Sequence, residues 1–242
     1  MNTAAPVAAA AAAENPYGLQ GLWQNGGPIA QTTLIILLIM SAVSWYIIFS
    51  KLWDQRRLRK GAKVVEKQFW SSGSLKEAVD RLPKDSDFRA VAEDGLRASA
   101  HHEGRLTDRI DLHEWVTMSL QRSVDSVNSK LSNGLAFLAT VGSTAPFVGL
   151  FGTVVGILKA LVNIGVSGQA SIDKVAGPVG EALIMTAIGL FVAVPAVMGY
   201  NWLLRRNKSI SESLRNFASD LHAYLVGGAR VSQGAPVAGV KK

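Results

Sequence analysis

The sequence predicts an all-α membrane protein with three transmembrane helices that continue into a cytosolic helical bundle. Three stretches of the 242-residue chain contain no Asp, Glu, Lys or Arg, namely residues 15–50, 131–158 and 182–204. A helix that crosses a bilayer needs about 20 predominantly apolar residues, and each stretch provides that length. Only 18% of the residues are charged and 48% are hydrophobic, so the composition also favours packing in lipid.

The first transmembrane helix is expected over residues 28–50, after a flexible tail of residues 1–27. A cleavable signal peptide is the alternative for this end of the chain, and it requires basic residues before its apolar core. The first basic residue is Lys51. The sequence therefore favours a transmembrane helix over a signal peptide.

A cytosolic helical domain is expected over residues 51–134. Its basic first part can extend the first helix until the run Ser-Ser-Gly at residues 71–73 stops it. Ser74 and Glu77 have the spacing of a capping box, which predicts a short helix directly after this run. A further helix is expected over residues 87–103.

The next element is expected to be one continuous helix over residues 108–160, with Thr107 as its N-cap. Its apolar residues recur every three or four positions, and only Gly134 could interrupt the pattern. The second transmembrane part of this helix is expected over residues 135–160. A loop of residues 161–177, outside the cytoplasm, should follow.

The third transmembrane helix is expected over residues 178–204. The apolar pattern continues beyond it, so a cytosolic helix is expected over residues 205–228, ending at Gly227-Gly228. The remaining residues, 229–242, are expected to be a disordered tail.

Basic residues gather where the first and third predicted spans end. Arg56 and Arg57 follow the first span, and Arg205 and Arg206 follow the third. Because basic segments stay on the cytoplasmic side, the N-terminus is expected outside the cytoplasm. These arginines are expected to face the headgroups of inner-membrane lipids. Topology thus accounts for the formal charge of +7, and no nucleic-acid partner is expected.

Glu181 directly precedes the third apolar stretch. A carboxylate inside a spanning helix is costly and by default marks an ion or proton pathway. If the helix begins at Pro178, Glu181 lies at its entrance, where the helix dipole and interfacial water tolerate an acid. If the helix begins after Ser171, Glu181 lies about 14 Å along it, near mid-membrane. The apolar stripe from Ile172 favours the deeper start, but the residues alone leave the functional and the interfacial interpretations equally open.

Small residues recur at steps of three and four along the second and third predicted spans. Such residues allow helix backbones to approach closely in lipid, so helix packing is the expected role of most of them. They are Gly142, Gly149, Gly152, Gly156, Gly189 and Ala193. Thr153 and Thr186 are the polar members, and an intramembrane threonine commonly donates to the carbonyl four residues earlier. Pro146 and Pro195 interrupt the same spans and are expected to kink them.

The composition excludes several kinds of chemistry. The chain has no cysteine, and its four histidines show no metal-binding spacing, so thiol chemistry is excluded and no metal site is expected. The run GLFGTVVG lies in an apolar helix rather than after a strand, so no nucleotide site is expected. We expect no enzyme activity and no cofactor; only protons, and lipid headgroups at the surface, are expected ligands.

Two segments resemble the signature of a known family. They are Ala145–Gly156, APFVGLFGTVVG, and Gly180–Asn201, GEALIMTAIGLFVAVPAVMGYN. In order and spacing they are similar to the MotA/TolQ/ExbB proton-channel family, and most similar to its ExbB branch. The resemblance implies that Glu181 is the family's intramembrane acid and that Thr153 and Thr186 face the pore.

The resemblance also implies an assembly and a function. Family members form a homo-pentamer around a pore that holds single-span helices of an ExbD-like partner. The complex uses the proton motive force to act on a TonB-like protein and so energises TonB-dependent outer-membrane transport, including iron–siderophore uptake. The chain is therefore expected to be a proton-conducting stator subunit, a molecular-motor part in the bacterial inner membrane. The alternatives are a TolQ-like subunit of the Tol-Pal envelope system and a non-conducting membrane scaffold.

Overall fold

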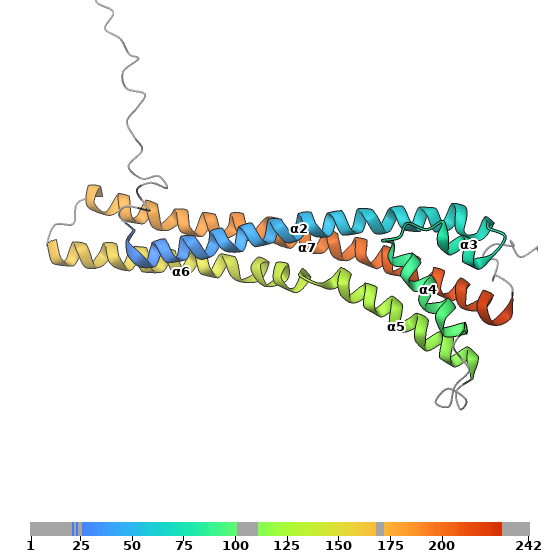
Figure 1. Ribbon diagram of the computed structural model, residues 1–242. Helices are drawn as coiled ribbons and strands as arrows, with labels where there is room; N and C mark the ends of the chain where they lie inside the picture. The colour runs from blue at the N-terminus through green and yellow to red at the C-terminus, as the bar shows by residue number, and fades with distance from the viewer. Residues whose placement is uncertain (1–20, 22, 24–25, 101–110, 168–171, 229–242) are drawn as a thin grey trace, which may run out of the picture. The chain divides into compact units, whose positions relative to one another are not determined.

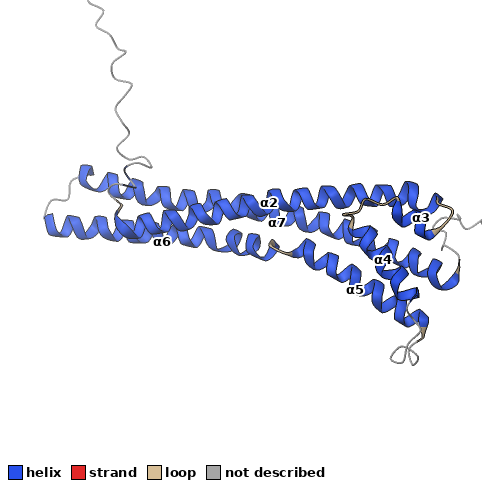
Figure 2. Cartoon of the chain, viewed as in Figure 1, coloured by secondary structure: helices blue, strands red, loops and turns tan. Residues whose placement is uncertain are grey.

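The computed structural model describes residues 21, 23, 26–100, 111–167 and 172–228 of the chain. Every regular element within these residues is a helix, in agreement with the predicted all-α class (Figure 1, Figure 2). The elements in chain order are α2 (Gly27–Gln68), the short 3-10 helix η2 (Phe69–Ser71), α3 (Leu75–Asp80), α4 (Asp87–Ala100), α5 (Leu112–Ser132), α6 (Leu135–Ser167) and α7 (Ile172–Gly227).

Three helical stretches are long and apolar enough to cross a membrane, as the sequence predicted. They are Gly27–Ser71, Leu112–Val166 and Ala176–Gly227. The chain itself buries only 22%, 22% and 33% of their most apolar windows. Apolar surface of this extent is stable only where lipid or other protein covers it.

The chain divides into two compact units. The first contains residues 1–46 and 137–199, and the second contains residues 47–136 and 200–242. In the first unit, Met185 of α7 is buried beside Leu34 of α2. Gly152 of α6 lies against the same place, because a Cβ on it would be 3.0 Å from Cε of Met185 and 3.3 Å from Cγ2 of Thr33. The three apolar helix segments of this unit therefore meet around Met185.

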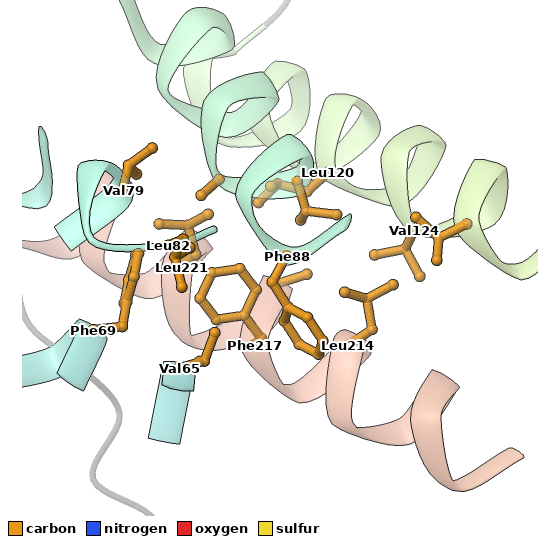
Figure 3. Close-up of a cluster of buried hydrophobic side chains, with 14 of the residues drawn as sticks. Val65, Phe69, Val79, Leu82, Phe88, Leu120, Val124, Leu214, Phe217 and Leu221 are labelled. Carbon is orange, nitrogen blue, oxygen red and sulfur yellow. The ribbon is translucent and has the colours of Figure 1, made fainter. Parts of the chain in front are cut away.

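The second unit has its own hydrophobic core, to which α2, η2, α3, α4, α5 and α7 contribute. Figure 3 shows part of it. Phe217 of α7 is central to it, because its ring centroid lies 5.1 Å from that of Phe69 and 5.6 Å from that of Phe88. Both pairs meet edge to face, the arrangement that aromatic rings favour. Figure 3 also shows Leu120 of α5 and Leu221 of α7 in this cluster.

The predicted capping signal at Ser74 is confirmed. The Ser74 hydroxyl accepts a hydrogen bond from the backbone N–H of Glu77, and α3 begins at Leu75. α2 ends at Gln68 and η2, which follows it directly, ends at Ser71, where the sequence predicted the stop. Thr107 and the tail of residues 229–242 lie outside the described residues, as do residues 1–20 of the expected N-terminal tail.

The single helix expected over residues 108–160 is wrong. α5 ends at Ser132, α6 begins at Leu135, and Gly134 between them has a φ of +82°. Figure 2 shows this interruption as a short loop. A positive φ takes the chain out of the right-handed helix and favours glycine, so the apolar pattern continues through a point where the backbone does not.

The segment expected as a loop over residues 161–177 is largely helical. α6 continues to Ser167 and α7 begins at Ile172, so Pro178 lies inside α7 rather than at its start. The expected third span is thus the middle of a longer helix. α7 ends at Gly227, where the sequence predicted its end, and Gly228 follows with a φ of +69°.

Candidate functional site

Thr153 of α6 places a buried hydroxyl against α7. Its Oγ1 lies 2.7 Å from the carbonyl oxygen of Ala182 and 2.5 Å from Oγ1 of Thr186. The carbonyl of Gly149, four residues earlier on α6, is farther away at 3.2 Å. The closest partners of this threonine are therefore on the neighbouring helix rather than on its own.

The two threonine hydroxyls form a short hydrogen-bond chain. A hydroxyl has one proton to donate and can also accept, so Thr186 can donate to Thr153 while Thr153 donates to the Ala182 carbonyl. Only 6% of Thr153 is exposed. The backbone carbonyl at the end of this hydroxyl chain accepts a hydrogen bond but has no proton to pass on, so the two hydroxyls can relay a proton only when they turn toward groups that exchange one.

Glu181 is half-buried and directly precedes Ala182, whose carbonyl accepts from Thr153. α7 begins nine residues before it, at Ile172, so Glu181 lies about 14 Å along the helix. This agrees with the alternative in which the helix begins after Ser171 rather than at Pro178.

Glu181 and Thr186 do not share a face of α7. They are five residues apart, which places them about 140° apart around the helix axis. The buried residues Ala182, Met185 and Gly189 lie between them. Within the described part of the chain, the Glu181 carboxylate forms no hydrogen bond or ion pair.

Glycines allow the backbones of α6 and α7 to touch. A Cβ on Gly149 would lie 2.7 Å from the carbonyl oxygen of Met185, and a Cβ on Gly189 would lie 2.7 Å from that of Ala145. Real Cβ atoms do not approach backbone this closely. This contact, four residues before Thr153, brings its hydroxyl within reach of α7.

The other small residues predicted for packing lie on the same buried faces. A Cβ on Gly156 would lie 2.9 Å from the Cβ of Ala182, and one on Gly142 would collide with Val197. A Cβ on Gly152 would lie 3.0 Å from Cε of Met185. Ala193 is buried.

Pro146 and Pro195 both lie inside continuous helices, in α6 and α7 respectively. A proline in a helix has no N–H to donate to the carbonyl four residues earlier. The carbonyls of Gly142 and Phe191 therefore lack their usual helical donor.

A family model described as MotA/TolQ/ExbB proton channel family matches residues 84–216, more than half of the chain. The chain belongs to this family. The match covers α4, α5, α6 and most of α7, including every residue of the hydroxyl chain described above. Together with the three apolar helices, membership makes the chain an inner-membrane protein.

Relatives in several bacteria are similar over most of their length. A protein named Biopolymer transport protein ExbB in Xanthomonas campestris pv. campestris is 43% identical over 212 residues, 84% of each chain. One of the same name in Neisseria gonorrhoeae is 37% identical over 213 residues, 86% of this chain and 97% of the relative. Tol-Pal system protein TolQ of Pseudomonas aeruginosa is 34% identical over 209 residues, 84% of this chain and 90% of the relative.

The arginines of this family member have different surroundings. Arg57 forms an ion pair with Asp85 at 2.8 Å, and Arg205 is exposed. The guanidinium of Arg206 lies over the ring of Trp202, with 4.5 Å between its central carbon and the ring centroid. Burial lowers the pKa of Arg206, and the nearby charges of Arg59 and Arg56 lower it further. Cations thus crowd one another here, which favours anionic neighbours.

Sequence reasoning missed two buried amides, Gln55 of α2 and Asn207 of α7. Both are almost fully buried and hydrogen-bonded to each other. Each follows a predicted span by a few residues, in a segment for which the sequence indicated only basic residues and a continuing helix. Within the described residues, no group of His, Asp and Glu could hold a metal ion.

Proposed function

We propose that the chain is a proton-conducting stator subunit that, with an ExbD-like single-span partner, uses the proton motive force to energise TonB-dependent outer-membrane transport. The observation that carries the proposal is the Thr153–Thr186 hydroxyl chain, which ends on the carbonyl of Ala182, the residue after Glu181, in a member of a proton channel family. Protons can only move along groups that both accept and donate, and these three side chains are of that kind.

In this mechanism, Glu181 takes up and releases the proton, and the two hydroxyls carry it or stabilise the charge. Because Glu181 has no partner within the described part of the chain, we place an acid of the partner's helix opposite it. One charge that crosses 100 mV releases about 2.3 kcal/mol. Useful work on a TonB-like protein therefore needs several protons for each cycle.

The proposal includes a homo-pentamer with its N-termini in the periplasm. Three apolar helices per chain are too few to enclose a pore, and most of their apolar surface is uncovered by the chain itself. Identical neighbours would cover part of this surface, and lipid the rest. The basic residues after the first and third spans support a cytosolic location for residues 51–134 and 205–242.

Glu181→Gln in living cells tests this function. The amide has nearly the same volume but cannot exchange a proton, so iron–siderophore uptake should be lost while the variant still copurifies with its partner. Glu212→Gln, an exposed acid farther along α7, is the matched control and should support normal uptake. Normal uptake by Glu181→Gln would refute the proposal.

A TolQ-like role in the Tol-Pal system is the second candidate, and the similarity to TolQ of Pseudomonas aeruginosa favours it. Both roles use the same proton pathway but different partners. Copurification of the native chain distinguishes them, because an ExbD-like partner supports the first role and a TolR-like partner the second. A non-conducting scaffold would instead leave proton leak unchanged when Glu181 is replaced.

A further inference from the structure

The break between α5 and α6 leaves backbone carbonyls that need donors. The last four carbonyls of a helix have no donor within it. At the end of α5, the N–H of Asn133 donates to the carbonyl of Ser129 at 3.1 Å. The chain then turns at Gly134, so the carbonyls of Lys130 and Leu131 cannot be bound in the helical way.

Side chains of two other helices bind these carbonyls. The ammonium of Lys51 on α2 donates to the carbonyl of Lys130 at 2.7 Å. The amide nitrogen of Asn207 on α7 donates to the carbonyl of Leu131 at 2.9 Å. The end of α5 is therefore capped by residues far away in the sequence. Among the described residues, the C-cap residue Asn133 contributes only its backbone N–H, which donates to Ser129.

Gln55 of α2 holds Asn207 in place. Its Nε2 donates to Oδ1 of Asn207 at 2.6 Å and to the carbonyl of Leu203 at 3.1 Å. The orientation of both amides is fixed, because a backbone carbonyl at Leu131 can only accept. Asn207 must therefore direct its nitrogen to Leu131 and its oxygen to Gln55. Gln55 must in turn donate from its own nitrogen.

The side-chain oxygen of Gln55 indicates that the carbonyls of Leu131 and Leu203 determine how the two amides are oriented. Gln55 is fully buried, and its Oε1 has no donor among the described residues. An unpaired buried acceptor destabilises a fold. The side chain nevertheless keeps this orientation. If the amide were flipped, its oxygen would lie against two other acceptors, the carbonyl of Leu203 and Oδ1 of Asn207.

α2 covers the break along one face. Ile47, Lys51 and Gln55 are spaced four residues apart, so they lie above one another on the helix. A Cβ on Gly134 would lie 3.1 Å from Cγ2 of Ile47. The same face therefore contacts the turn, binds the first carbonyl and holds the amide that binds the second.

We propose that Lys51 and Asn207, with Gln55 behind Asn207, form a C-cap supplied by other helices that sets where α5 ends. They are positioning residues: they tie the last turn of α5 to α2 and α7, so that the three helices act as one body at this level. The proposal rests on these contacts and not on the proposed function, so it can fail independently of proton conduction.

Hydrogen–deuterium exchange of the full-length protein in detergent micelles tests the proposal. Asn207→Leu keeps a similar volume but cannot donate to Leu131, so amides in peptides covering residues 126–136 should exchange about tenfold faster. Asn201→Leu, an exposed amide on the same helix, is the control and should leave the exchange unchanged. Unchanged exchange in Asn207→Leu would overturn the proposal.

Lys51 provides a second test in case Asn207→Leu does not fold. Lys51→Met retains the apolar stem but removes the donor to Lys130, and it should accelerate exchange in the same peptides. Lys51→Arg keeps a donor at the end of the side chain and should restore most of the protection. If Lys51→Met exchanges like the native chain, α5 ends at Gly134 without help from Lys51, and the proposed cap is wrong.

Discussion

The hydroxyl oxygens of Thr153 and Thr186 lie 2.5 Å apart, although 33 positions separate the two residues in the sequence. The contact exists because Gly149 and Gly189 let the backbones of α6 and α7 touch. The small residues and the polar residues therefore act together in forming this contact. The packing residues set the distance at which the two hydroxyls can meet.

The hydroxyl chain predicts that Thr186→Val reduces proton flux. Valine keeps the volume but leaves Thr153 without its hydroxyl neighbour, so the relay is interrupted. We expect at least about a tenfold decrease in flux through the complex reconstituted with its partner. Thr144→Val is the control, because Thr144 is exposed on α6 and donates to the carbonyl of Thr140. Equal flux in the Thr186 variant would reduce this residue to a packing role.

The glycine contact predicts that Gly149→Ala destabilises the first unit. The added Cβ would lie 2.7 Å from the carbonyl oxygen of Met185, so the two backbones must separate, at a cost of about 1–3 kcal/mol. Gly165→Ala is the matched control on the same helix, because nothing lies within 4 Å of its added Cβ. Thermal unfolding in detergent should show a lower midpoint only for Gly149→Ala, and equal midpoints would contradict the close contact.

The turn between α5 and α6 predicts a cost for Gly134→Ala. A residue with a Cβ at this positive φ lowers the free energy of unfolding by about 1–2 kcal/mol. The Cβ would also press on Ile47. Gly228→Ala separates the two effects, because Gly228 has a similar φ of +69° but open space around it. Unfolding measurements should therefore rank Gly134→Ala as the more destabilised variant, and the reverse order would contradict the packing at the turn.

The sequence allowed the prediction of features that local signals determine. The three apolar helices follow from runs without charge, and the start of α3 follows from the spacing of Ser74 and Glu77. Glu181 and the two threonines could be selected as candidates from their residue types and from the resemblance. In each case the physical cause lies within one helix or one turn.

Features that depend on distant residues could not be predicted. The end of α5 depends on Lys51 and Asn207, which lie 79 and 76 positions from the carbonyls they bind. The apolar pattern itself suggested a continuous helix. The pairing of Thr153 with Thr186 likewise required the crossing of α6 and α7, which no pattern within either helix specifies.

The most direct measurement of the central claim is proton flux into liposomes that contain the chain and its ExbD-like partner, with an applied membrane potential. The native complex should conduct, and Glu181→Gln should reduce the flux to that of empty liposomes, whereas Glu212→Gln should conduct normally. Native flux through the Glu181→Gln complex would contradict the assignment of Glu181 as the residue that carries the proton.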